Sequence, residues 1–192
     1  GSGGSCAGTN RSASTAYEPG SGITIQAYAG ICAGDDLQPN SEDYFHRVSL
    51  NELLTFTTSG GGASCGTLTS TGNAVPVVSP VASFTIPGRT PFTLTAAASD
   101  GDGDALTYVW EQFDLGAANA EGVLSSTVAT GPMFRSYAPS SDPSRTFPSW
   151  RYILANANVP PATAPLPGTA TPSYMTGEVL PNVSRTPNFP VP

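Results

Sequence analysis

The hydrophobic positions of this chain fall into short alternating runs, whose character changes near residue 76. Before that point, one run at residues 22–28 alternates apolar and polar side chains, which is the period of a short strand. After it, runs rich in β-branched and aromatic residues recur at roughly ten-residue spacing, as in a β-sandwich. These predicted strands are residues 77–78, 84–86, 92–95 and 106–110.

One segment has a helical period. Apolar residues at near-helical spacing are Leu50, Leu53, Leu54 and Phe56. Ser49 and Glu52 have the spacing of a capping box, in which each side chain accepts a backbone N–H of the other residue. The pattern predicts a helix of two to three turns over residues 50–57, with its leucines packed onto residues 14–34. Consecutive glycines at 60–62 end it.

The same patterns predict two domains. Residues 1–66 form a small α+β unit, residues 67–76 are a small-polar linker, and residues 77–192 form an all-β sandwich. Prolines at alternate positions near the C-terminus remove the N–H donors that a final strand requires. We therefore expect the last strand of the sandwich to be incomplete, or to be supplied by something else.

Composition narrows the functional classes. The seven basic residues are all arginine, and fourteen carboxylates give a net charge of −7. Because no basic run exists to neutralise phosphates, a nucleic-acid partner is not expected. No apolar run is long enough to span a membrane. The N-terminal residues lack the pattern of a signal peptide, so we interpret Gly1 as a cut or processed end.

Three cysteines, Cys6, Cys32 and Cys65, are an odd number. In a secreted protein this predicts one disulfide and one thiol whose partner lies elsewhere. The alternative is a buried free thiol at each position.

Three carboxylates follow one another on a glycine-rich turn, at Asp100, Asp102 and Asp104. At this spacing they can converge on a hard cation such as Ca²⁺. The alternative is a hydrogen-bonded turn in which the aspartates accept their own backbone amides. With residues 106–110, the motif resembles the D-x-D-G-D-x-L-T-Y-x-W pattern of polycystic-kidney-disease-type and related immunoglobulin-like modules, which implies an immunoglobulin-like sandwich for residues 77–192. Trp110 is expected in the core, as the inward-facing aromatic residue of a central strand.

Residues 5–66 as a block resemble the C-terminal end of the catalytic domain of reprolysin-like (M12B-type) zinc metallopeptidases, which are metzincins. The resemblance is to the form fused to a β-sandwich in bacterial secreted proteins. It is carried by residues 4–6, 10–11, 13–20, 23–32, 34–35, 37–41, 44–46 and 49–54.

The resemblance implies both a site and a disulfide. In that family a preceding H-E-x-x-H-x-x-G-x-x-H helix binds zinc, and a Met-containing turn underlies the metal. Gln26 stands where the family has Met, and Gln26 and Tyr28 would form the floor and wall of the cleft. The resemblance also implies a Cys6–Cys32 disulfide and leaves Cys65 with a partner upstream of Gly1.

Catalytic zinc of this class requires three protein ligands, whereas the whole chain contains one histidine. The chain alone is therefore expected not to hold the family's zinc. The first hypothesis for function is a fragment of a secreted zinc metalloendopeptidase, acting in the parent protein on protein or peptide substrates and inactive by itself.

Two other hypotheses stay open. The chain could be an extracellular structural or adhesive module that forms homo-oligomers by completing its sheet with a neighbour's strand. His46 could be a catalytic base beside Ser49 or Asp43, although no oxyanion signature accompanies it. The alternative role of His46 is structural, as a partner of the helix that follows it.

Overall fold

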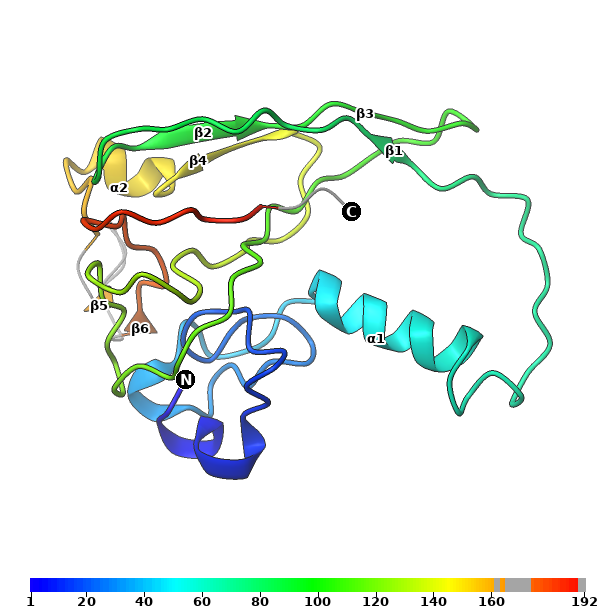
Figure 1. The fold of residues 1–192 in the computed structure, drawn as a ribbon, viewed down its shortest axis with the longest axis horizontal. Helices are drawn as coiled ribbons and strands as arrows, with labels where there is room; N and C mark the ends of the chain where they lie inside the picture. The colour runs from blue at the N-terminus through cyan, green and yellow to red at the C-terminus, as the bar shows by residue number, and fades with distance from the viewer. Residues whose placement is uncertain (161–162, 165–173, 190–192) are drawn as a thin grey trace.

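The computed structural model describes residues 1–160, 163–164 and 174–189, and Figure 1 shows a mixed α and β fold with short elements. Within these ranges, three 3₁₀ turns (η) come first, and two α-helices and six short strands follow. In order they are η1 Gly4–Cys6, η2 Gly8–Asn10, η3 Ala33–Asp35, α1 Arg47–Thr58, β1 Val77–Val78, β2 Phe92–Thr95, β3 Ala98–Ser99, β4 Ser144–Phe147, α2 Trp150–Leu154, β5 Thr163–Ala164 and β6 Tyr174–Met175.

The strands form antiparallel pairs: β1 with β3, β2 with β4, and β5 with β6. The strands predicted at 77–78 and 92–95 are confirmed as β1 and β2. Those predicted at 84–86 and 106–110 are wrong, since residue 108 makes one isolated bridge, to residue 140. Neighbouring segments are held there by side chains, for example through the indole of Trp110, which donates to the carbonyl of Pro143 at 3.0 Å.

An aromatic core lies in the described residues from 77 onward, hereafter the C-terminal half. Phe147 of β4 is fully buried and stacks on Phe92 of β2, with ring centroids 4.9 Å apart. Phe134 and Phe189 approach the same ring at 5.0 and 4.8 Å. Trp110, the predicted core residue, is partly buried against this cluster.

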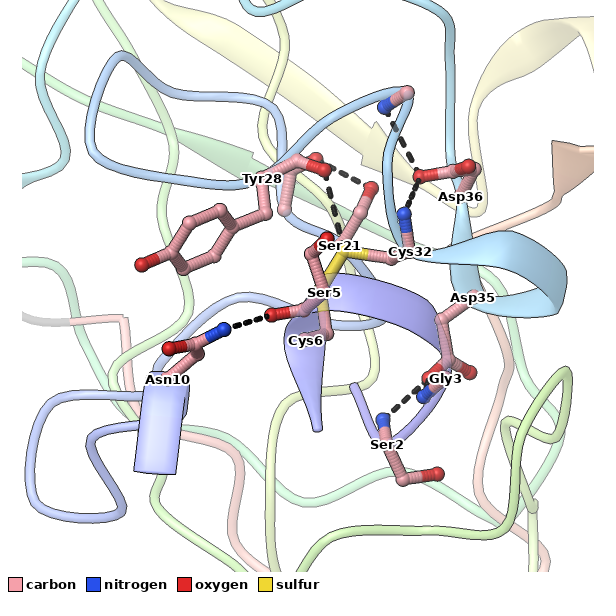
Figure 2. Close-up of a disulfide and its surroundings, with 12 residues drawn as sticks. Ser2, Gly3, Ser5, Cys6, Asn10, Ser21, Tyr28, Cys32, Asp35 and Asp36 are labelled. Atoms are coloured by element: carbon pink, nitrogen blue, oxygen red, sulfur yellow. Dashed lines mark hydrogen bonds between the residues drawn. A yellow bond between two sulfur atoms is a disulfide. The ribbon is translucent and has the colours of Figure 1, made fainter. Parts of the chain in front are cut away.

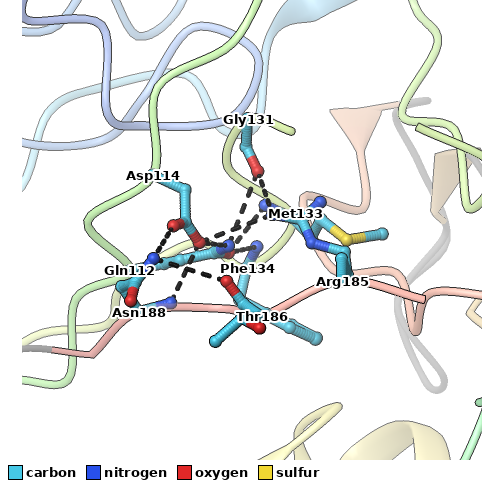
Figure 3. Close-up of polar contacts among 8 residues, drawn as sticks. All are labelled: Gln112, Asp114, Gly131, Met133, Phe134, Arg185, Thr186 and Asn188. Atoms are coloured by element: carbon cyan, nitrogen blue, oxygen red, sulfur yellow. Dashed lines mark hydrogen bonds and ion pairs between the residues drawn. The ribbon is translucent and has the colours of Figure 1, made fainter. Parts of the chain in front are cut away.

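The C-terminal segment, 181–189, runs beside this core without forming a strand (Figure 1). Asp114 holds it, because its carboxylate accepts the backbone N–H of Asn188 at 3.1 Å and lies 3.4 Å from the guanidinium of Arg185 (Figure 3). The amide of Phe113 adds one backbone bond, to the carbonyl of Asn188 at 2.8 Å. Side-chain contacts thus take the place of the ladder that the prolines interrupt.

Turns stabilised by buried carboxylates build residues 1–46, hereafter the turn block. Asp35 accepts the amides of Gly3 and Gly122, each at 2.8 Å. Asp36 accepts those of Gly30 and Cys32, each at 2.9 Å. The apolar cluster of the turn block is small, Ile23 and Leu37 packed with Met175. These hydrogen bonds and the disulfide therefore also hold its shape.

The structure joins Cys6 to Cys32, the pair that the resemblance implies, with Cα atoms 5.2 Å apart (Figure 2). Cys65 is an exposed free thiol. The alternative of buried free thiols is therefore wrong for all three cysteines.

Two expectations for helix α1 are wrong. The helix begins at Arg47 rather than at residue 50, because the imidazole of His46, and not the Ser49 hydroxyl, accepts the first free amide. Its apolar side chains are not buried against residues 14–34 but remain between 41% and 59% exposed. They are Leu50, Leu53, Leu54 and Phe56.

The turn block and the C-terminal half contact each other directly. The hydroxyl of Tyr44 lies 2.6 Å from that of Ser136, and the amide of Met175 donates to the carbonyl of Asp36 at 2.7 Å. Leu124 packs both against the aromatic core and against the cluster of Ile23, Leu37 and Met175. The predicted linker, 67–76, contains no helix or strand and loops away from this body to reach β1 (Figure 1). No helix in the described ranges is long and apolar enough to cross a membrane.

Candidate functional site

A groove of about 500 Å³ lies between the turn block and helix α1. Its floor is the bend at residues 20–28, one wall is α1, and the N-terminal segment closes another side. The residues lining it that matter below are Tyr17, Glu18, Gln26, Tyr28, His46, Leu53 and Phe56.

The groove floor is a pair of turns, so the strand predicted at 22–28 is wrong. One carboxylate organises it: Glu18 accepts the amides of Ile23 and Thr24 at 2.8 and 3.2 Å and the Thr24 hydroxyl at 2.7 Å. These donors would otherwise be available to a ladder. Burial raises the pKa of Glu18, and the bonds from Ile23 and Thr24 act against that rise. The bend also requires glycine at position 22. Its φ is +66°, and a Cβ there would lie only 2.7 Å from the Cβ of Ala27.

Gln26 and Tyr28, the predicted floor and wall residues, both line the groove and are exposed. The amide of Tyr28 donates to the carbonyl of Ser21 at 3.1 Å, which closes the bend. The structure therefore brings the two residues together on one surface, opposite the apolar side chains of α1.

The first turn of α1 is the most enclosed part of this region. His46 is 2% exposed, and its Nδ1 accepts the amide of Val48 at 3.2 Å. From the C-terminal half, Glu111 accepts the amide of Arg47 at 2.8 Å and approaches Nε2 of His46 at 3.6 Å. The helix is thus capped by one residue from each half of the chain.

Aromatic rings enclose this cap. Tyr17 stacks on Phe113 with centroids 3.9 Å apart, and His46 lies parallel to both at 5.9 and 6.1 Å. Burial lowers the pKa of His46 to about 4, with a further contribution from the charge of Arg47. The pKa of Glu111 is raised to about 7, chiefly by burial and in smaller part by the neighbouring Glu18.

These contacts argue against the hypothesis that His46 acts as a catalytic base. Its Nδ1 is engaged by a backbone amide, its ring is buried, and its lowered pKa weakens it as a base. Ser49 lies within α1 and is buried. The geometry matches the structural role, that of a partner to the following helix.

The groove does not fit catalytic zinc by itself. It presents one imidazole, that of His46, and the Glu18 carboxylate already accepts three donors from the floor. A zinc site needs three such ligands around an open position.

Elsewhere in the described ranges, one group of three or more metal-ligating side chains comes together, Asp100, Asp102 and Asp104, with ligand atoms within 4.8 Å of one another. Asp100 also accepts the amides of Asp102 and Asp104 at 2.8 and 3.2 Å, as the hydrogen-bonded turn requires. The three predicted carboxylates therefore lie together. They also form the hydrogen-bonded turn that the sequence offered as the alternative to a cation site.

Sequence reasoning missed Glu18 and the capping role of Glu111. Glu18 had a weak signal, since a carboxylate preceding Pro19-Gly20 is placed to accept amides of the turn that follows. Glu111 had none, because 64 positions separate it from the amide that it accepts.

Comparison with known proteins adds no family assignment: no family model, curated protein or solved structure matches the chain.

Proposed function

We propose that this chain is the C-terminal part of a secreted zinc metalloendopeptidase, supplying the floor and one wall of a peptide-binding cleft. The observation that carries the proposal is the groove itself. It joins the bend of Gln26 and Tyr28 to the apolar side of α1, in the segment that resembles the metzincin catalytic domain. In this proposal the C-terminal half is the immunoglobulin-like sandwich fused to that domain.

The exposed face of α1 supports the proposal. A helix of a globular protein normally buries its apolar stripe, and contiguous exposed apolar surface marks an interaction site. Leu50, Leu53 and Leu54 remain exposed on α1, and Leu53 borders the groove together with Tyr28. A zinc-binding helix from a preceding part of the parent polypeptide would cover this face and bring the three imidazoles that the chain lacks.

Within such a cleft, the residues of this chain bind and position a peptide rather than hold metal. Tyr28 offers an exposed ring and hydroxyl at the edge, and Gln26 offers an amide that can donate to and accept from a peptide backbone. The Cys6–Cys32 disulfide anchors the loop that carries both, and it suits an oxidising, extracellular compartment.

The deciding experiment is to read the coding sequence immediately upstream of Gly1 and to express the extended polypeptide. We expect an H-E-x-x-H-x-x-G-x-x-H motif there and chelator-sensitive cleavage of an unstructured protein such as casein. A variant of the extended protein with the motif's Glu replaced by Gln is the control. An upstream segment without the motif, or cleavage that survives both chelation and the Glu→Gln change, would contradict the proposal.

We also propose that Asp100, Asp102 and Asp104 bind Ca²⁺, because their ligand atoms already lie together. Calorimetric titration of the chain with Ca²⁺ is expected to show one binding event that Asp102→Asn removes. Asp43→Asn, the same chemical change in the turn block, is the matched control and should leave binding intact. Equal binding by both variants would place the ion elsewhere.

The second candidate function is a self-assembling extracellular module. It is favoured by the two-stranded β2–β4 sheet, beside which the described part of the C-terminal segment forms no strand. A neighbour's strand could extend such a sheet. Sedimentation across a wide dilution series tests it, since strand exchange predicts concentration-dependent oligomers and a monomer at every concentration excludes it.

A further inference from the structure

Helix α1 is anchored to the C-terminal half at its first turn, through His46 and Glu111. Nε2 of the histidine and Oε2 of the glutamate lie 3.6 Å apart, and their side chains are 3% and 12% exposed. Beyond this turn the apolar side chains of α1 are largely exposed. The position of the helix, and with it the shape of the groove, therefore depends strongly on this pair.

The hydrogen bonds require a neutral imidazole. Nδ1 of His46 accepts the amide of Val48, so it carries a lone pair and not a proton. The single ring proton is then on Nε2, directed toward Glu111. The parallel rings of Tyr17 and Phe113 fix the plane of the imidazole, which leaves little freedom to exchange the roles of its two nitrogens.

The surroundings of Glu111 favour its protonated form. The carboxyl is enclosed, and the Glu18 carboxyl of the turn block lies near it and also raises its pKa. The Tyr44 hydroxyl, the other titratable group nearby, is uncharged because burial raises its own pKa. Opposing the rise in the pKa of Glu111 are the amide and the guanidinium of Arg47, and the latter stands over the Phe113 ring at 5.4 Å. Burial is the largest contribution, and it raises the pKa of Glu111 to about 7.

We propose that His46 and Glu111 form a proton-compensated latch. In the undocked, solvated state at mildly acidic pH, His46 is an imidazolium and Glu111 a carboxylate. On docking, Nδ1 of His46 loses its proton to solvent and the carboxyl of Glu111 takes one up. One N–H bond is broken and one O–H bond is formed, so docking of α1 involves no net exchange of protons.

The two titrations have opposite signs. The pKa of His46 falls on docking from 6.5 to about 4, so its contribution favours docking above pH 6.5 and is lost as the pH falls toward 4. The pKa of Glu111 rises from 4.5 to about 7, so its contribution favours docking below pH 4.5 and is lost as the pH rises toward 7. Between pH 4.5 and 6.5 the two slopes cancel, and the groove keeps its shape over this range.

This inference is independent of the proposed peptidase function, because it concerns groups inside the chain and requires neither zinc nor substrate. A failure of either proposal leaves the other intact.

The wild-type chain supplies the first test. His46 is the chain's single histidine, so its imidazole proton signals in NMR are unambiguous. We expect them to titrate near pH 4 in the folded protein and near 6.5 in urea. Infrared spectra at pH 6 should contain the C=O band of a buried, protonated carboxyl. Titration of folded His46 near 6.5, or absence of that band, would overturn the latch.

Variants then separate the two halves of the pair. Relative to wild type, Glu111→Gln should lower the unfolding equilibrium constant about tenfold per pH unit as the pH rises from 4.5 to 6.5, because the His46 titration is no longer offset. His46→Asn, which retains a good helix cap, should raise that constant about tenfold per unit over the same range.

Glu52→Gln is the matched control, a carboxylate-to-amide change at an exposed position of the same helix. It should follow the wild-type profile and keep the infrared band. If Glu111→Gln and His46→Asn also run parallel to wild type, the pair is not a latch. If either variant does not fold, the NMR and infrared measurements on the wild-type chain still decide.

Discussion

The two halves of this molecule are stabilised in different ways. The C-terminal half packs aromatic rings around Phe147, which is fully buried. The turn block instead surrounds carboxylates with backbone amides, through Glu18, Asp35 and Asp36, and adds the disulfide. Apolar burial is non-directional and tolerates some rearrangement, whereas hydrogen bonds to a buried carboxylate specify one geometry. The candidate site lies in the half whose geometry is specified by polar contacts.

The largest effect is expected in the aromatic core. Phe147→Ala should lower the free energy of unfolding by about 3–5 kcal/mol, because it removes a fully buried ring and leaves a cavity. Denaturant unfolding followed by tryptophan fluorescence measures this. If the two halves are stabilised separately, hydrogen exchange in this variant should increase first in β2 and β4, and equal acceleration in residues 20–36 would contradict the comparison.

The next effect belongs to the turn block. A Cys6→Ala/Cys32→Ala double variant should lose about 2–4 kcal/mol, since the bond joins residues 26 apart in sequence. Limited proteolysis should then cleave within residues 1–36 while leaving the C-terminal half intact. Cys65→Ala, at the exposed free thiol, is the control and should match wild type.

Loss of the Glu18 carboxylate tests the floor of the groove directly. Glu18→Ala should cost about 1–3 kcal/mol, because it leaves the amides of Ile23 and Thr24 without their acceptor in a buried turn. Amide exchange at these two residues is the measurement. Unchanged protection there would show that the turn forms without Glu18.

The smallest effect is expected on α1, and a pair of leucines makes it quantitative. Leu54 is 59% exposed and Leu94 is 6% exposed. Leu54→Ala should change the free energy of unfolding by less than about 0.5 kcal/mol, whereas Leu94→Ala should cost about 2–5 kcal/mol. Thermal and denaturant unfolding of the two variants side by side would check this. Similar costs would mean that another surface covers the α1 face in solution.

Local patterns predicted the elements that depend on local chemistry. The strands at 77–78 and 92–95 follow from β-branched and aromatic alternation, and a helix near residue 50 follows from apolar spacing. The strand predicted at 22–28 had the same alternation and is instead two turns. Alternation does not reveal a competing acceptor, and Glu18 takes the amides that a strand would have paired.

The start of α1 shows the same limit. The spacing of Ser49 and Glu52 is that of a capping box, yet His46 caps the helix together with Glu111. A capping motif depends on local spacing alone, whereas the two acceptors of α1 are a residue outside the motif and a glutamate 64 positions away.

The sequence by itself determined the acidic, loop-rich character of the chain, its odd thiol, the clustering of three aspartates on one turn, and two of the strands. Each of these depends on composition or on neighbours along the chain. Tertiary structure alone decided that α1 leaves its apolar face open, that Glu18 organises the groove floor, and that His46 meets Glu111. These outcomes depend on hydrogen-bond competition and burial among residues brought together by folding, and those quantities are defined only once the chain is packed.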